Sequence, residues 1–306
     1  MKKLFYILCA SLVVLACKKG VDADKPTVEV TATNARETKG DTLIYKLGDT
    51  CKFNISGYAD NITFWSGNVG SLYSLRARNQ AFGKLQLSFT TTAANGTQAA
   101  TLKVLAITNL KNLDSVTLYN ADWKDITSRM NLATTSTAVN TGTVDVTDLV
   151  TSPSDVLFLA FRYAGQTGTA QRTWVISNFS FNSTGADFNY PLITIANDVS
   201  YWTVYGNVWA PNGRKWIPTS SSLTIAGGDA TQPNNVSWLV SKPLYVNRVV
   251  PDQPTAIVKN LTAATPNFFQ YKYAAVGVYK VSFVAYNHTV NDTKTVSKDL
   301  LIKVSP

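Results

Sequence analysis

Aspartates are the residues of this sequence that are best suited to chemistry. Five of them fall close together, at Asp122, Asp125, Asp145, Asp148 and Asp155. A glycosidase needs two carboxylates that face each other across the scissile bond, and a structural Ca²⁺ takes carboxylate and carbonyl oxygens. Asp145 and Asp148 flank predicted turns, where an aspartate commonly accepts hydrogen bonds from nearby backbone, and no D-x-D-x-D spacing occurs. We therefore predict no catalytic residues and no enzyme, and leave a structural calcium ion open as an alternative.

Other catalytic residue types are scarce. The sequence has 1 histidine and 3 cysteines, which excludes a HExxH metal site, a multi-histidine zinc centre and a disulfide-stapled scaffold. His288 follows a predicted strand, and we expect it to be an exposed loop residue. No G-x-S-x-G elbow, P-loop or G-x-G-x-x-G motif is present. The sequence thus predicts no cofactor.

Aromatic side chains are concentrated between residues 201 and 216. This segment is rich in Asn, Pro and Gly and does not alternate cleanly, so we predict a loop or short hairpin on a rigid β-scaffold. An indole ring can stack on the apolar face of a sugar while Asn and Arg side chains bind its hydroxyls. Large aromatics also fill cores, and we expect that role for Trp202. The candidate ligand-binding residues are Tyr205, Asn207, Trp209, Asn212, Arg214 and Trp216.

The first 17 residues have the features of an export signal. A cationic start, Met1–Lys3, precedes an apolar run from Leu4 to Ala16 that is too short to span a membrane as a helix. The ending Val14-Leu15-Ala16-Cys17 resembles the lipobox of bacterial lipoproteins. The resemblance implies lipidation of the Cys17 thiol, and Lys18 in place of an aspartate implies delivery to the outer membrane, on either face. The alternative is an ordinary secretory signal that is cleaved after Ala16.

Nearly every apolar segment after residue 26 alternates with a period of two. Segments such as Cys51–Ser56, Val156–Tyr163 and Tyr279–Asn287 are rich in β-branched and aromatic residues, and clusters of Gly, Asn, Asp and Pro separate them. Cys51 shares a strand face with apolar residues and is expected to be buried. The best helix candidate is weak, at Ala121–Met130. With 306 residues, 45% hydrophobic and 15% charged, the chain is long enough for two domains and is not disordered, so we predict an all-β protein.

Two groups of strands resemble halves of a single sandwich. Gly48–Gly67 and Phe269–Ala285 resemble the early strands and the late Y-x-Y…G-x-Y-x-V-x-F hairpin of PKD-type immunoglobulin-like domains. About 200 residues separate the two groups. A domain inserted into an exposed loop explains this spacing, because insertion is tolerated where the two ends of the insert lie close together.

The strands between these halves resemble the jelly-roll domains of secreted adhesins and bacterial surface lipoproteins. In those domains a W-L-I-S-P strand usually comes first, whereas Trp238–Pro243 comes last here, as an insertion with permuted ends would produce. The full order of motifs resembles an uncharacterised family of Bacteroidota lipoproteins, a domain of unknown function. The expected division is a signal peptide at 1–16, a tether at 17–26, an immunoglobulin/PKD-like β-sandwich at 27–80 and 246–306, and an inserted jelly-roll β-sandwich at 81–245.

The function that we expect is binding rather than catalysis. The resemblance implies a lipid-anchored outer-membrane protein whose partners are membrane lipid through Cys17, a glycan and an outer-membrane transporter complex. The formal net charge of +9 comes from scattered Lys and Arg residues, so nucleic acid is not expected as a partner. The alternative function is that of a structural or adhesin-type lipoprotein that binds protein and no glycan. A hydrolase is the least favoured reading.

Overall fold

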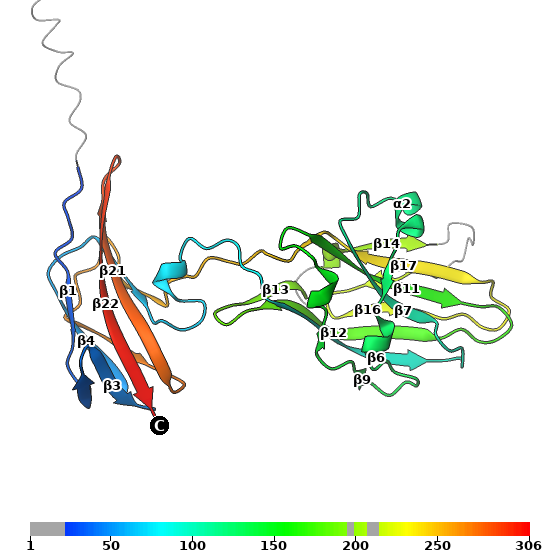
Figure 1. Cartoon of the computed structure of the whole chain (residues 1–306), viewed down its shortest axis with the longest axis horizontal. Coiled ribbons are helices and arrows are strands. Elements are labelled where there is room, and N and C mark those ends of the chain that lie inside the picture. Colours follow the sequence, from blue (N-terminus) through cyan, green and yellow to red (C-terminus); the bar gives the residue numbers. More distant parts are fainter. Residues whose placement is uncertain (1–21, 195–198, 207–213) are drawn as a thin grey trace, which may run out of the picture. The chain divides into compact units, whose positions relative to one another are not determined.

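A computed structural model describes residues 22–194, 199–206 and 214–306 of the chain (Figure 1). It divides into two compact units, a first unit formed by the chain up to Ala77 together with Pro251–Pro306, and a second unit formed by Arg78–Val250. Nearly all of the described elements are strands arranged in packed sheets, which confirms the all-β prediction. The sequence predicts that the inserted domain spans residues 81–245, whereas the second unit of the structure spans residues 78–250. The two junctions between the units therefore lie between residues 77 and 78 and between residues 250 and 251.

The first unit has two sheets. The core between them follows the period of two, since Cys51, Phe53 and Ile55 are buried along one strand and Phe53 lies 5.1 Å from Phe283, centroid to centroid. The predicted burial of Cys51 is therefore confirmed. The smaller sheet has the order β1 (Glu29–Ala32), β4 (Thr50–Ser56) and β20 (Phe268–Lys272). The larger sheet has the order β19 (Ala256–Lys259), β5 (Asn61–Trp65), β21 (Gly277–His288), β22 (Thr293–Ser305), β3 (Thr42–Lys46) and β2 (Glu37–Lys39).

The segment expected to be a tether, residues 17–26, is described from Asp22 onward, and there it packs against the first unit. Ala23 and Pro26 are buried. The backbone N–H of Ala23 donates to the Asp292 carboxylate (3.2 Å), and the carbonyl of Asp24 accepts a hydrogen bond from the Asn287 amide (2.8 Å). Residues 23–26, which the sequence assigned to a tether, are thus part of the packed first unit, because two polar side chains near the end of the sequence satisfy their backbone.

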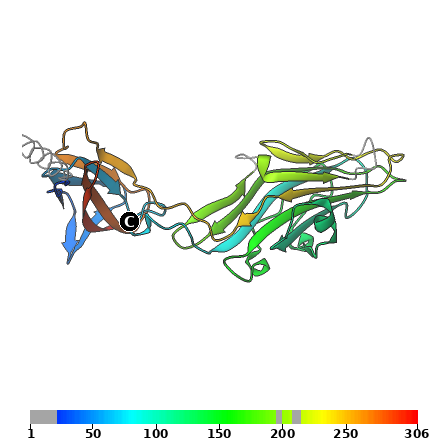
Figure 2. The same ribbon diagram turned by 90° about the horizontal axis from the view of Figure 1, so that it is seen from above.

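The second unit is a sandwich of two sheets (Figures 1 and 2). Residues of both sheets, among them Phe89, Phe161 and Trp202, form one core. One sheet has the order β10 (Val144–Asp145), β6 (Lys84–Ala94), β12 (Thr173–Thr184), β16 (Ser222–Ile225) and β15 (Ile217–Pro218), with β13 (Asn189–Thr194) beside β12 and β9 (Val139–Asn140) beside β6. The other has the order β14 (Trp202–Gly206), β17 (Asn235–Ser241), β11 (Val156–Gly165), β7 (Leu102–Thr108) and β8 (Lys124–Asp125), with β18 (Leu244–Tyr245) beside β11.

The helix candidate at Ala121–Met130 does not form an α-helix, so that prediction is wrong. That stretch holds β8 and the 3₁₀ helix η2 (Thr127–Arg129), because the Asp125 carboxylate accepts the Thr127 N–H (3.0 Å) and turns the chain there. The α-helix within the described residues is α2 (Ser115–Asn120). Asp114 caps its N-terminus, because the Asp114 carboxylate accepts a hydrogen bond from the Thr117 N–H (2.8 Å). The other 3₁₀ helices are η1 (Tyr73–Leu75), η3 (Thr147–Leu149) and η4 (Val199–Tyr201). Within the described ranges, no helix is long and apolar enough to cross a membrane.

The chain crosses between the two units twice, and in each unit the two crossing segments lie beside each other. In the second unit, the Ala81 N–H donates to the Asn247 carbonyl (2.8 Å). In the first unit, the Leu72 N–H donates to the Asp252 carboxylate (2.9 Å), and the Gln253 N–H donates to the Gly70 carbonyl (3.0 Å). Adjacent ends are what the insertion of one domain into a loop of another requires.

Candidate binding site

The tryptophans of the 201–216 segment that the structure describes are core residues. Trp216 is 2% exposed, its ring lies near Phe161, and its indole N–H donates to the Ser237 carbonyl (3.3 Å). Trp202 is also buried, as expected, and packs edge-on against Phe179. A buried indole has no free face for a sugar, so the structure places Trp216 in the hydrophobic core and not on a binding surface.

Two other predicted ligand residues, Tyr205 and Arg214, are described by the structure, and each makes a contact within the protein. The Tyr205 hydroxyl donates a hydrogen bond to the Leu113 carbonyl (2.6 Å). The Tyr205 side chain is partly buried, and this burial raises the pKa of its phenol. The Arg214 side chain is exposed, while its carbonyl accepts a hydrogen bond from Asn235 (3.0 Å). Asn207, Trp209 and Asn212 lie outside the described residues.

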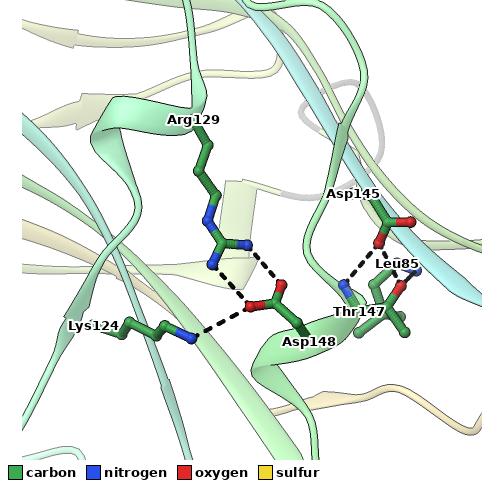
Figure 3. A network of polar contacts seen from close by, with 6 residues as sticks. All are labelled: Leu85, Lys124, Arg129, Asp145, Thr147 and Asp148. Atoms are coloured by element: carbon green, nitrogen blue, oxygen red, sulfur yellow. Dashed lines mark hydrogen bonds and ion pairs between the residues drawn. The ribbon is translucent and has the colours of Figure 1, made fainter.

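The clustered aspartates hold loops in place (Figure 3). Asp148 accepts two hydrogen bonds from the Arg129 guanidinium (2.6 and 2.8 Å) and pairs with Lys124 (3.3 Å), which holds the pKa of its carboxyl well below the usual range. Asp145 accepts the N–H and the hydroxyl of Thr147 (2.9 and 2.6 Å). Both carboxylates are therefore committed to structural partners, and Figure 3 shows them turned toward different groups.

Asp155 has the same structural role deeper in the unit. Its carboxylate accepts hydrogen bonds from the Asn109 amide and from the N–H groups of Thr151 and Ser152, each at 2.9 Å, which lowers the pKa of Asp155 to about 2. Asp125 pairs with Lys103 (2.9 Å). Across residues 22–194, 199–206 and 214–306, no three His, Cys, Asp or Glu side chains come together as a metal site would need.

A concave site occurs elsewhere in the second unit, and we call it the tyrosine cleft. Its volume is about 330 Å³, within the range of small-ligand sites. β13 supplies Tyr190, η4 supplies Tyr201 and β18 supplies Tyr245, so the cleft is assembled from three separate parts of the chain. The complete lining is Tyr190, Leu192, Tyr201, Lys242, Pro243, Leu244, Tyr245 and Arg248.

The core and two backbone hydrogen bonds fix the shape of the tyrosine cleft. Leu192 and Leu244 are buried members of the core of the second unit. The Lys242 N–H donates to the Tyr201 carbonyl (2.7 Å), which joins η4 to the chain that follows β17. The Arg248 N–H donates to the Tyr245 carbonyl (3.2 Å), and this turn places the guanidinium 5.0 Å from the centre of the Tyr245 ring.

The tyrosine cleft combines aromatic surface with positive charge. The Lys242 ammonium lies 5.9 Å from the centre of the Tyr201 ring and contacts the Ser200 hydroxyl (3.2 Å). None of the lining residues is acidic. Among the described residues, no hydrogen bond involves the phenol hydroxyls of the three tyrosines. The cleft therefore offers aromatic faces, hydroxyl donors and acceptors, and two cations to a ligand.

A second, larger cleft of about 640 Å³ has both apolar and polar residues in its lining. It lies beside β7 and the start of β12, with Leu102, Leu132 and Trp174 in its walls. The Arg172 guanidinium, which also lines this cleft, donates hydrogen bonds to the carbonyls of Gln98 (2.8 Å) and Thr134 (2.6 Å), so its N–H groups already have protein partners. Lys103 and Asp125 in the lining pair with each other (2.9 Å), so the charged groups of this cleft already have protein partners.

The fold defines a β-sandwich protein in which one sandwich is inserted into the other. The sequence matches the DUF5017 family, a domain of unknown function, over residues 16–200, and the chain belongs to that family. The matched range includes Tyr190 of the tyrosine cleft but not Tyr201, Tyr245 or the two cations. No curated protein and no solved structure gives a significant match.

Proposed function

We propose that this protein is a lipid-anchored outer-membrane lipoprotein of the kind found in Bacteroidota, and that it binds carbohydrate without catalysing a reaction. The proposal rests on the tyrosine cleft, where Tyr190, Tyr201 and Tyr245 meet Lys242 and Arg248. A tyrosine ring has an apolar face that packs against the C–H face of a sugar and a hydroxyl that binds the sugar's hydroxyls. The rigid β-scaffold beneath the cleft keeps these groups oriented before a ligand arrives.

The charge of the cleft favours an acidic sugar, such as a uronic acid. Lys242 and Arg248 lie beside the aromatic rings, and no carboxylate in the lining neutralises them. A sugar carboxylate would accept charge-assisted hydrogen bonds from one or both cations, and these bonds are stronger than those between neutral groups. The lipobox-like ending of the export signal, Val14-Leu15-Ala16-Cys17, supports the lipid anchor at Cys17. A role in glycan capture beside an outer-membrane transporter is part of the same proposal.

A glycan array carrying neutral and uronic-acid oligosaccharides tests the proposal, with a matched pair of arginine variants. Arg248→Ala removes a guanidinium that stacks on Tyr245 in the cleft. Arg76→Ala removes a similar guanidinium, 4.2 Å from the Tyr73 ring in the first unit. Because a hydrogen bond to a charged group contributes roughly 1.5–3 kcal/mol, we expect Arg248→Ala to weaken acidic-glycan binding about 10- to 100-fold. Arg76→Ala should leave binding unchanged.

Two results would remove the proposal. The wild-type protein could retain no glycan, in which case co-purification with a transporter subunit would favour the protein-binding alternative. The two arginine variants could also weaken binding equally, which would place the sugar elsewhere. The protein could also retain neutral and acidic oligosaccharides equally, with binding weakened only in Arg248→Ala. That result would support the tyrosine cleft as the binding site and contradict the preference for acidic sugars.

A further inference from the structure

Residues 22–27 fix the point at which the chain leaves the first unit. Hydrogen bonds from Ala23 to Asp292 and from Asn287 to Asp24 attach this segment to the end of the β21–β22 hairpin. The Thr27 N–H donates to the Tyr58 carbonyl (2.9 Å). Figure 1 shows the described chain beginning beside the hairpin turn, at the end of the unit opposite the C-terminus. A group attached shortly before Asp22 is therefore held near this end.

Three exposed apolar side chains lie at the same end, each in a turn. Tyr58 follows β4 and Leu261 follows β19, and each is more than half exposed, while Val290 in the β21–β22 turn is fully exposed. Two hydrogen bonds tie the turns together, since the Asp60 carboxylate accepts the His288 N–H (3.2 Å) and the buried Lys259 ammonium donates to the Asp60 carbonyl (3.0 Å). The three side chains thus project from one connected surface, which we call the hairpin end.

Chain length limits the distance between the hairpin end and a lipid anchor. Cys17 precedes Asp22 by five residues. Even a fully extended chain rises at most about 3.6 Å per residue, so five residues span no more than about 18 Å. An acylated Cys17 lies at the bilayer surface, and the hairpin end must then lie within that reach of the surface.

We propose that the hairpin end rests on the lipid surface of the outer membrane, with Tyr58, Leu261 and Val290 among the headgroups. This inference rests on the proposed lipid anchor. Tyrosine favours the membrane interface because its ring is apolar and its hydroxyl is polar, and exposed Leu and Val side chains gain from leaving water. The Lys259 ammonium lies 5.5 Å from the centre of the Tyr58 ring, and this cation–π contact helps to hold the ring in place. The first unit would then be oriented by the membrane, with its C-terminus pointing away from it.

Two cysteine variants on one strand pair test this orientation. Val290→Cys places a thiol at the hairpin turn, whereas Val278→Cys places one at another exposed position, near the other end of β21. Ten residues of strand, about 33 Å, separate Val278 from the last residue of β21. Native Cys51 does not compete for label, since it is buried and burial raises the pKa of its thiol to about 12.

The measurement uses the lipidated full-length protein, expressed with its own export signal and reconstituted into vesicles of phosphatidylethanolamine and phosphatidylglycerol. Each cysteine carries an environment-sensitive fluorophore, and some vesicles contain a quencher on the lipid near the headgroup. Flotation of the protein with the vesicles reports the anchor independently. We expect the protein to float, and we expect the lipid-borne quencher to reduce fluorescence at least twofold at position 290 and to leave position 278 unchanged.

The outcomes separate the orientation from the anchor. If the protein floats and position 290 is not quenched more than position 278, the anchor stands and the proposed orientation is wrong. If the protein does not float, the lipid anchor is wrong and the orientation falls with it.

Discussion

At the scale of single residues, burial decides what an aromatic side chain does. Trp216 precedes a two-residue strand and Tyr245 ends one, yet Trp216 is buried and Tyr245 is half exposed on a cleft. The sequence predicts correctly that Trp202 is buried, because large aromatic side chains fill cores. It cannot distinguish Trp216 from a surface tryptophan, since the partner of the indole N–H, Ser237, lies on a strand 21 residues further along the chain.

Trp216→Ala should destabilise the second unit strongly. Removing a buried tryptophan leaves a cavity, and such changes lower the free energy of unfolding by about 3–5 kcal/mol. Urea denaturation followed by circular dichroism measures the loss. Arg214→Ala is the control, because its exposed side chain should contribute no more than about 0.5 kcal/mol. If Trp216→Ala were as stable as the wild type but retained no glycan, Trp216 would return to the set of binding residues.

The Asp155 carboxylate should make stability depend on acid. Its pKa is about 2 in the folded protein and about 3.9 in an unfolded chain, so it stabilises the fold above about pH 4 and loses that effect as pH falls toward 2. Asp155→Asn should therefore lower the melting temperature at pH 7, and the difference from the wild type should shrink between about pH 4 and pH 2. Calorimetry across this range measures it. A difference that stays constant down to pH 2 would contradict the assigned hydrogen bonds.

At the scale of elements, long alternating strands were predictable and short elements were not. β4 and β6 bury every second residue, and the sequence shows this period directly. β8, β10 and β15 have two residues each, which is too few to show any period. The α2 helix depends on the Asp114 cap rather than on an apolar stripe, which is why the sequence favoured a neighbouring segment instead.

The attachment of β1 to β4 should depend on a glycine. Gly57 has a positive φ of 85°, and a Cβ added there would overlap the backbone carbonyl of Thr27. Gly48 also has a positive φ, of 98°, with open space around it. Gly48→Ala should cost about 1 kcal/mol from backbone strain alone, whereas Gly57→Ala should cost more because Thr27 must move.

Chemical denaturation of the two glycine variants gives the comparison, and hydrogen exchange locates the effect. We expect faster exchange in residues 27–32 for Gly57→Ala and native exchange there for Gly48→Ala. Equal stability losses with no change at the N-terminal strand would mean that Thr27 and Gly57 do not pack as the structure describes.

At the scale of the whole molecule, the junctions predicted from the sequence lie within five residues of those between the two compact units, but the sequence does not reveal the tyrosine cleft. The halves of the first unit are recognisable because each keeps its own strand pattern on either side of the insert. The tyrosine cleft has no such local signal, because Tyr190, Tyr201 and Tyr245 come from three segments that only the folded sandwich brings together. The packing of residues 22–26 was missed for the same reason, since Asp292 and Asn287 are more than 260 residues away.

Calorimetric titration of an array-selected acidic oligosaccharide into two tyrosine variants tests the central claim most directly. Tyr245→Ala removes an aromatic face from the tyrosine cleft, and Tyr119→Ala removes an equally exposed tyrosine at the end of α2, outside that cleft; their exposed fractions are 48% and 47%. Loss of a stacked aromatic face and its hydroxyl should weaken binding by about tenfold or more for Tyr245→Ala, and Tyr119→Ala should bind like the wild type. Unchanged affinity in Tyr245→Ala, or a larger loss in Tyr119→Ala, would show that the tyrosine cleft is not where the sugar binds.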